Sequence, residues 1–199
     1  GIANEQTLTE FPLYIREVAD LNAVNTLMEQ ARRDDTQRKA ELARQEKLRA
    51  YLFDLGTKEH VGTLQLGGVR RFTPVLAADV YREESGYGFF PQAPTHTFDM
   101  HWVNGALNRD GVRLSRDSRF QFRAAPGRYR LRAGFASPGN VTLRGVTIAD
   151  QANNTFDFKS DNPIIDSVVV VGNEPVALES NHADLSWVTL VEETGSPAK

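Results

Sequence analysis

The sequence contains no cysteine among its 199 residues. This absence excludes disulfide bonds, thiolate catalysis and cysteine-ligated zinc. It does not exclude secretion, because many extracellular bacterial domains lack disulfides. No apolar run reaches the roughly 18 residues that a membrane helix needs. The net charge is only -3, so no global excess of charge directs the chain to nucleic acid or to a membrane surface.

Motifs for catalysis and nucleotide binding are missing as well. There is no P-loop, no dinucleotide fingerprint and no Gly-x-Ser-x-Gly elbow. His182, Asp184 and Ser186 supply the residue types of a hydrolytic triad, but three alternating strand residues do not place a base beside a nucleophile. We therefore expect no catalysis in this chain. The chain begins with Gly1-Ile2 and not with Met, which predicts a processed or excised piece of a longer protein.

Residues 1–50 have a helical periodicity. Apolar residues recur at intervals of three and four, which places them on one stripe of a helix; they are Leu13, Val18, Leu21, Val24, Leu27, Met28 and Ala31. Asp34-Asp35 suggests a break between two helices. A helical segment or linker that packs on a neighbouring domain is expected, because isolated helices need a packing surface. A coiled coil is the alternative, but sustained heptads are absent.

From Tyr51 onward the period changes to two. The Arg residues of 128–132 alternate with apolar ones, and 164–171 is a β-branched run suited to a central strand. Turn signals separate these runs at Pro126-Gly127, Pro138-Gly139-Asn140 and Gly172-Asn173. Short strands at regular spacing predict a mainly β sandwich or barrel over residues 51–193, followed by a disordered tail over residues 194–199.

Six short motifs in this region resemble, in the same order, those of a known family. They are Phe53-Asp54-Leu55-Gly56-Thr57, Gly68-Val69-Arg70-Arg71-Phe72-Thr73-Pro74-Val75, Tyr81 with Gly86-Tyr87-Gly88-Phe89, Leu107-Asn108-Arg109-Asp110-Gly111-Val112, Phe120-Gln121-Phe122 with Gly127-Arg128-Tyr129-Arg130-Leu131, and Ala183-Asp184-Leu185-Ser186-Trp187-Val188-Thr189-Leu190. The family is the galactose-binding-like β-sandwich domain found N-terminal to rhamnogalacturonan acetylesterases and in other polysaccharide-degrading enzymes.

The resemblance implies a galactose-binding-like (jelly-roll) antiparallel β-sandwich, preceded by the N-terminal helical segment. Leu55 stands where the family has an aromatic residue. The Gly-Asp-Ser nucleophile motif of the esterase is absent, so only the accessory domain is implied and not its catalysis. Domains of this type often hold a structural calcium ion, for which Asp54 and Asp184, near the first and last strands, are candidate ligands.

A sugar site needs exposed aromatic side chains beside hydrogen-bonding groups. The aromatic-rich segment 81–102 offers Tyr87, Phe90 and Trp102 for stacking, and Phe90 before Pro91 is expected to begin a loop. The polar candidates are Glu84, Asn108 and Arg109. The alternative is that Tyr87 and Phe89 belong to the core and the other aromatic residues are partly covered, because large aromatic residues mostly serve packing.

Charge is unevenly distributed along the chain. Residues 101–145 hold nine Arg and two Asp, whereas residues 150–199 hold nine acidic residues and two Lys. One interpretation is a strip formed by Arg128, Arg130 and Arg132, with Arg119 and Arg123 nearby, that binds uronate or sulfate groups. The other is that the basic and acidic segments pair across strands.

These observations predict a non-catalytic carbohydrate-binding accessory module of a secreted or periplasmic polysaccharide-active protein. Its expected partners are a polysaccharide or oligosaccharide and a neighbouring catalytic domain, with no nucleic acid and no membrane. The alternative is a structural domain that braces a neighbouring domain or an oligomer without binding sugar. A hydrolase or lyase activity in the chain itself comes third, because no spacing of carboxylates or nucleophiles supports it.

Overall fold

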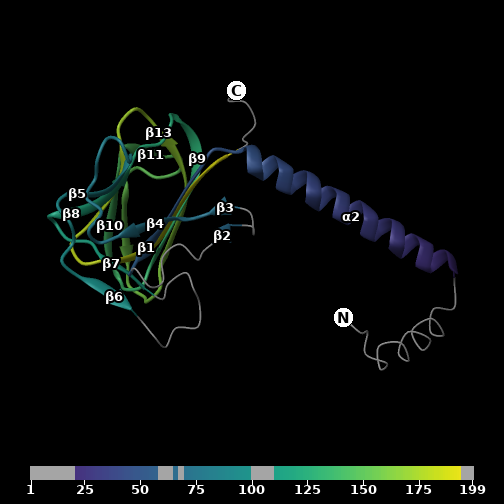
Figure 1. Cartoon of the computed structure of the whole chain (residues 1–199), viewed down its shortest axis with the longest axis horizontal. Helices are drawn as coiled ribbons and strands as arrows, with labels where there is room; N and C mark the ends of the chain where they lie inside the picture. The colour runs from purple at the N-terminus through teal and green to yellow at the C-terminus, as the bar shows by residue number, and fades with distance from the viewer. Residues whose placement is uncertain (1–20, 58–64, 67–69, 100–109, 194–199) are drawn as a thin grey trace. The chain divides into compact units, whose positions relative to one another are not determined.

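The computed structural model describes residues 21–57, 65–66, 70–99 and 110–193. The chain divides into two units, Gly1–Lys47 and Leu48–Lys199. The described part of the first unit is one helix, and the second unit is mainly β (Figure 1). The described strands of the second unit form two large sheets and one two-stranded hairpin. The predicted tail over residues 194–199 lies outside the described residues.

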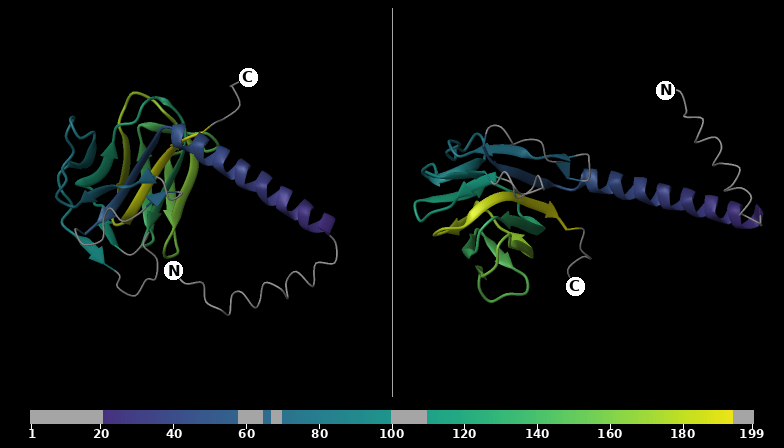
Figure 2. Two further views of the ribbon diagram at one scale, coloured as in Figure 1. Left: turned by 45° about the vertical axis from the view of Figure 1, so that its right-hand side comes forward. Right: turned by 90° about the horizontal axis from the view of Figure 1, so that it is seen from below.

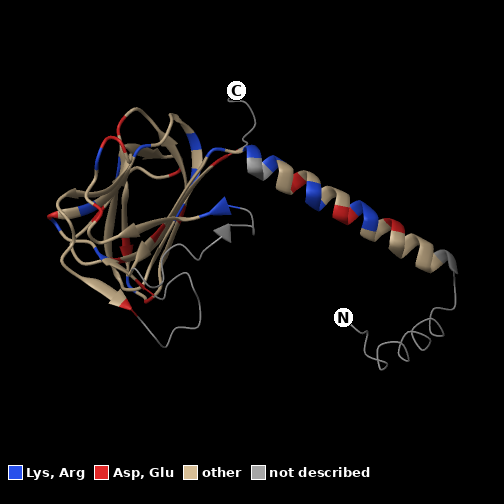
Figure 3. Ribbon diagram, in the orientation of Figure 1, with Lys and Arg blue, Asp and Glu red and all other residues tan. Residues whose placement is uncertain are grey.

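The helix of the first unit is α2 (Leu21–Lys47). It is continuous through Asp34-Asp35, so the predicted break there is wrong. The segment contains neither Gly nor Pro, and Lys39 Nζ lies 2.7 Å from Asp35 Oδ2, one helical turn away, where an ion pair supports the helix. Charges of both signs alternate along α2 (Figure 3). Among the described residues, no helix is both long enough and apolar enough to cross a bilayer.

The larger sheet has eight strands. Its main path is β11-β13-β9-β15-β1-β4, and β7 pairs with both β15 and β6. The last strand, β15, runs beside and antiparallel to the first strand of this sheet, β1 (Figure 2). In this pairing Ala50 is opposite Val191. The strands are β1 (Ala50–Gly56), β4 (Thr73–Leu76), β6 (Thr97–Asp99), β7 (Asp110–Arg113), β9 (Gly127–Phe135), β11 (Val146–Ile148), β13 (Ile164–Val171) and β15 (Asp184–Glu192).

The smaller sheet has five strands in the order β12-β10-β14-β8-β5, and all four pairings are antiparallel. From β8 to β15, successive strands alternate between the two sheets, so every connection in this half of the chain crosses from one sheet to the other. The strands are β5 (Tyr87–Pro91), β8 (Ser118–Phe122), β10 (Gly139–Arg144), β12 (Thr155–Phe158) and β14 (Val176–Ser180), with β2 (Gln65–Leu66) and β3 (Arg70–Arg71) forming the separate hairpin.

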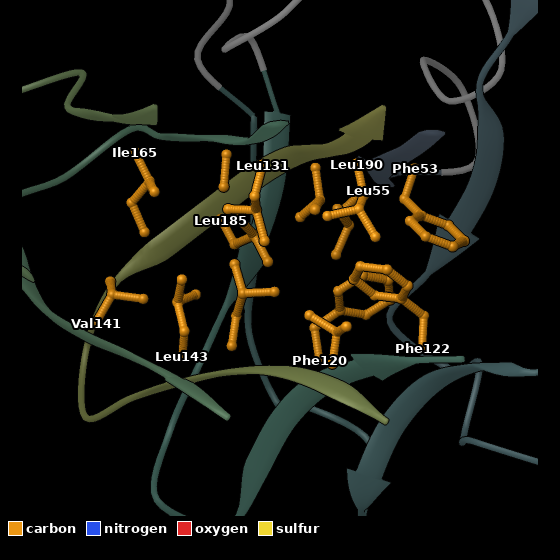
Figure 4. Packing of buried hydrophobic residues seen from close by; sticks show 14 of the residues in the cluster. Phe53, Leu55, Phe120, Phe122, Leu131, Val141, Leu143, Ile165, Leu185 and Leu190 are labelled. Atoms are coloured by element: carbon orange, nitrogen blue, oxygen red, sulfur yellow. The ribbon is translucent and has the colours of Figure 1, made fainter. Parts of the chain in front are cut away.

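The hydrophobic core lies between the two sheets. Side chains from both sheets point toward one another, with Phe53, Phe120 and Phe122 at one end of the view and Val141, Leu143 and Ile165 at the other (Figure 4). The ring of Phe53 from the large sheet lies 5.2 Å from that of Phe120 and 4.9 Å from that of Phe122 in the small sheet. Such ring pairs add to the stability that burial alone provides, so the two sheets are joined across the core.

A β-bulge changes the alternation in β15. The register of β15 against β9 shifts between Leu185 and Trp187, so one extra residue is accommodated. Leu185 and Val188 therefore both reach the main core, while Trp187 lies in a second cluster with Leu52 and Phe72. The simple period of two in the sequence could not reveal this change of face. Trp187 is buried, but it is not part of the core between the sheets.

Tyr129 is fully buried near the start of β9. Its hydroxyl donates a hydrogen bond of 2.8 Å to the carbonyl oxygen of Ala125, four residues upstream. Tyr51 Oη accepts a hydrogen bond of 2.8 Å from the backbone N–H of the same Ala125. The two tyrosines thus satisfy both backbone groups of one connecting residue, in the manner of the tyrosine corner of other β-sandwiches. Burial raises the pKa of Tyr129, which keeps the hydroxyl as a donor.

Candidate functional site

The aromatic rings of Phe89 and Phe90, which are consecutive in β5, lie on opposite faces of the small sheet. Tyr87 is half-buried, and its ring centre lies 5.4 Å from that of Phe53. Phe89 is fully buried in the core, whereas Phe90 is 40% exposed. Strand alternation explains the difference, because successive side chains point to opposite faces. Phe90 lies inside β5, so the prediction that it begins a loop is wrong, although its exposure agrees with a stacking role.

Strand register places a row of outward residues beside Phe90. Phe90 on β5 is opposite Arg119 on β8. On the next strands, Glu179 of β14 is opposite Thr142 of β10, which is opposite Thr155 of β12. The neighbours of these residues along each strand, such as Phe120 and Leu178, are in the core. The row therefore lies on the outer face of the five-stranded sheet.

Arg119 is the centre of a charged network in this row. Its guanidinium carbon lies 4.8 Å from the ring centre of Phe90, at a distance suited to a cation–π contact. Arg119 Nη1 donates to Glu179 Oε1 at 3.2 Å, and its Nε donates to Gln121 Oε1 at 3.1 Å. The other oxygen of Glu179 accepts from Arg144 Nε at 3.0 Å. One carboxylate thus positions two guanidinium groups, each of which has five N–H donors.

A hollow of about 260 Å³ lies on this face. Besides Phe90 and Arg119, its lining includes Arg116, whose Nε donates to Asn181 Oδ1 at 3.3 Å. Hydroxyl, amide, carboxylate and guanidinium groups therefore surround one exposed aromatic ring. The complete lining is Phe90, Pro91, Ser115, Arg116, Arg119, Asn140, Thr142, Glu179, Ser180 and Asn181.

The other residues predicted for the site are not brought to this hollow. Tyr87 lines a different hollow of about 570 Å³, together with Arg71 and Arg123. Glu84 is exposed in the turn before β5 and lines neither hollow. The remaining three, Trp102, Asn108 and Arg109, lie outside the described residues.

Sequence reasoning missed most of the hollow. Of its lining residues, Phe90 was predicted for stacking, and Arg119 was named only as a neighbour of the arginine strip. The others come from segments far apart in the chain; they include Arg116, Asn140, Glu179 and Asn181. The available signal was their outward position in alternating strands. That signal marks many residues on both sheets, and only the strand order brings these particular ones together.

The predicted arginine strip is divided between the two sheets. Arg128, Arg130 and Arg132 are exposed on β9 of the large sheet, whereas Arg119 is on β8 of the small sheet. Since the outer faces of the two sheets point in opposite directions, these residues do not form one surface. The Arg residues of β9 pair with acids instead: Arg130 Nε lies 2.6 Å from Asp166 Oδ1.

Further ion pairs join the basic segment 101–145 to the acidic segment 150–199. They confirm the interpretation that the two segments pair across strands. Arg128 pairs with Glu193 at 3.3 Å and Arg132 with Asp166 at 3.4 Å. The hydrogen bond from Arg130 is the main cause that lowers the pKa of Asp166 below its ordinary value.

The two predicted calcium ligands lie at different places on the large sheet. Both oxygens of Asp184 accept hydrogen bonds from Arg113, at 2.7 Å from Nε and 3.0 Å from Nη2. Asp54 is buried on β1, opposite Trp187. Within the described ranges there is no group of three or more His, Asp or Glu residues that could hold a metal ion. The burial of Asp184 is thus explained by an arginine partner, and the calcium site stays a prediction.

His182, Asp184 and Ser186, the residue types of a hydrolytic triad, differ in their surroundings. His182 is exposed in the turn before β15, and the carboxylate of Asp184 is engaged by Arg113. Ser186 lies buried at the β-bulge. In the part of the chain that the structure describes, Ser186 Oγ has no hydrogen-bond partner, so no histidine is positioned as its base.

Comparison with known proteins gives one informative similarity. No known family profile matches the sequence, and no curated protein matches it either. A solved structure, the crystal structure of protein YxiM from Bacillus subtilis, matches with a TM-score of 0.51 and 15% sequence identity. The match covers 76% of this chain and 42% of that one, so the chain spans less than half the length of that protein. At this identity the similarity shows the fold alone.

Proposed function

We propose that the second unit is a non-catalytic carbohydrate-binding accessory module of a secreted polysaccharide-active protein, and that it binds sugar on the outer face of the five-stranded sheet. The observation that carries the proposal is Phe90: an exposed aromatic ring inside a hollow lined by hydrogen-bonding side chains. A sugar ring has an apolar face that stacks on such a ring and hydroxyl groups that need polar partners. Phe90 and its surroundings offer both.

The cation–π contact also favours this role. Arg119 lies against Phe90 and is held by Glu179 and Gln121. Its position in the free protein is therefore defined, so that less conformational entropy is lost when a ligand binds. A pre-ordered aromatic and guanidinium pair suits the recognition of a ring that carries polar groups at its edge.

The galactose-binding-like jelly-roll class is part of the proposal. Alternation of successive strands between two sheets, from β8 to β15, is the connectivity expected of a jelly roll. The antiparallel pairing of the first and last strands of the sandwich agrees with it. These features support the family resemblance of the sequence motifs, and a structural calcium ion of that family is proposed with it.

The test is affinity electrophoresis of the whole chain in gels that contain neutral or acidic polysaccharides, with and without calcium. Phe90→Ala is expected to weaken binding about tenfold, as the loss of a stacked aromatic surface implies. The matched control is Ile164→Ala, which removes a side chain that is 45% exposed on the other sheet. Equal retardation of both variants and the original chain by every retarding polymer would contradict the placement of the site.

The second candidate function is a bracing role without sugar binding. It is favoured by α2, where Leu27 is 66% exposed and Met28 is 52% exposed. Exposed apolar side chains on consecutive residues of a helix suggest contact with another surface. Absence of retardation in every polysaccharide gel would favour this role over the first.

A further inference from the structure

A second hollow lies beside β10 and β12 of the small sheet and shares one lining residue with the first. It has a volume of about 600 Å³ and is lined by Thr142, Arg144 and Thr155 of β10 and β12 and by the connection that holds Asn153 and Asn154. Thr142 lines both hollows, and its hydroxyl lies 3.1 Å from that of Thr155. The two hollows therefore share Thr142 as a lining residue, and we call the two together the cross-strand groove.

The cross-strand groove follows the outward row from Phe90 on β5 to Thr155 on β12. These are the two edge strands of the five-stranded sheet. Because neighbouring strands lie about 4.8 Å apart, the row is roughly 19 Å long. That length exceeds a single sugar ring and fits several linked rings lying across the strands.

The charged residues that line the cross-strand groove are mostly basic. Arg116 and Arg119 line its first part, and Arg144 lines its second. Glu179 is the acid among the lining residues, and its two oxygens are already shared between Arg119 and Arg144. A ligand that carries carboxylate or sulfate groups would meet the remaining N–H donors of these guanidinium groups, which recognise such anions by paired hydrogen bonds.

We infer that the cross-strand groove binds an internal stretch of a linear acidic polysaccharide, with one ring stacked on Phe90 and anionic groups paired with Arg119 and Arg144. This rests on the proposed function and adds the charge and the extended shape of the ligand. Two hollows that share one lining residue suit a chain that continues beyond the site in both directions. A neutral sugar or a chain end would leave the groups around Arg144 without a role.

Charge is tested with polymers that differ only in their charge. The probes are polygalacturonate and alginate, each beside its esterified neutral form, with a sulfated galactan to separate sulfate from carboxylate recognition. The full chain is expected to bind an acidic polymer at least tenfold more tightly than its esterified form. Arg144→Gln is expected to lower that affinity about tenfold, which corresponds to one hydrogen-bonded charge.

The control variant is Arg128→Gln, which also removes an exposed arginine with an acidic partner, but from the other sheet. It is expected to bind like the original chain, and unchanged melting temperatures show that both variants fold. Length is tested with oligouronates of increasing size. Affinity should rise until the oligomer spans the roughly 19 Å of the row and then level off.

Each outcome has a separate meaning. Binding to neutral polymers that depends on Phe90 and ignores charge would keep the proposed function and overturn the inference of an acidic ligand. Full affinity with a monosaccharide or disaccharide would overturn the extended ligand. Equal loss of affinity in Arg128→Gln and Arg144→Gln would show that net charge alone matters. Binding of single-stranded oligothymidylate as tight as that of the polyuronates would identify a general polyanion surface and refute a saccharide site.

Discussion

The packing of Trp187 on Gly134, on the outer face of the large sheet, predicts how substitutions at these two residues change the free energy of unfolding. A Cβ atom added at Gly134 would lie 2.2 Å from Trp187 Nε1 and 2.4 Å from its Cε2. The indole ring therefore lies directly over the glycine, in the cluster with Leu52 and Phe72. Gly134→Ala must displace this ring, and such overpacking typically costs about 1–3 kcal/mol.

Whether Gly134→Ala raises or lowers the free energy of unfolding should depend on the side chain at position 187. Trp187→Ala alone is expected to cost about 3–5 kcal/mol, as for other large buried aromatic residues. Without the indole, the methyl group of Gly134→Ala has room. Alanine is then expected to stabilise the strand by about 0.5–1 kcal/mol relative to glycine, because glycine loses more backbone entropy on folding. The same substitution thus destabilises one background and stabilises the other.

Urea unfolding of the two single variants, the double variant and the original chain measures this coupling, which should be about 1.5–4 kcal/mol from these two effects together. Gly172→Ala is the control, because nothing lies within 4 Å of a Cβ atom there. Trp187→Leu provides a milder background if Trp187→Ala does not fold. Equal destabilisation by Gly134→Ala in both backgrounds would refute the packing of Trp187 on Gly134.

Two further changes test the hydrogen bonds of β9. Tyr129→Phe removes the donor to the carbonyl of Ala125 but keeps the ring, so it should lower the free energy of unfolding by about 1 kcal/mol; unchanged stability in urea would show that the hydroxyl is not needed. Asp166 has a lowered pKa because Arg130 donates to it, so its stabilising effect should be present above about pH 4 and disappear as the pH falls through its lowered value. The difference in melting temperature between the original chain and Asp166→Asn should therefore shrink toward about pH 2, and a difference that does not vary with pH would count against this pair.

The sequence predicted the mainly β character of residues after 50 and the helix before them, because both depend on local periodicity. The alternating Arg residues of 128–132 point outward, and Tyr129 and Leu131 are buried between them. The predicted break at Asp34-Asp35 is wrong, because the segment has neither Gly nor Pro and Asp35 pairs with Lys39 one helical turn away. It also could not show the change of face at Trp187, because a single bulge moves later residues to the other side of the strand.

The sequence predicted Phe90 as a stacking residue of the candidate site, and it indicated Arg119 only as a neighbour of the arginine strip. The exposure of Phe90 follows from alternation within β5, so the residue could be chosen from the local sequence. The contacts of Glu179 with Arg119 and Arg144 could not be predicted, because they depend on which strands are neighbours. The predicted arginine strip is wrong for the same reason. Arg119 and Arg128 are close in the sequence, but they lie on the outer faces of different sheets.

Local pattern by itself determined that the residues after 50 are mainly β and that side chains along a regular strand, such as those of 128–132, alternate between two faces. It also determined that no cysteine chemistry takes place in the chain. The tertiary structure alone decided which strands pair, and with that the sheet on which each arginine lies. It brought Phe90 of β5 and Thr155 of β12 to the two ends of one row. The physical reason is that the pairing of strands depends on residues far apart in the sequence, because the pairing must bury one face of each sheet in a common core. The alternation of side chains along a strand, in contrast, follows from the geometry of its own backbone.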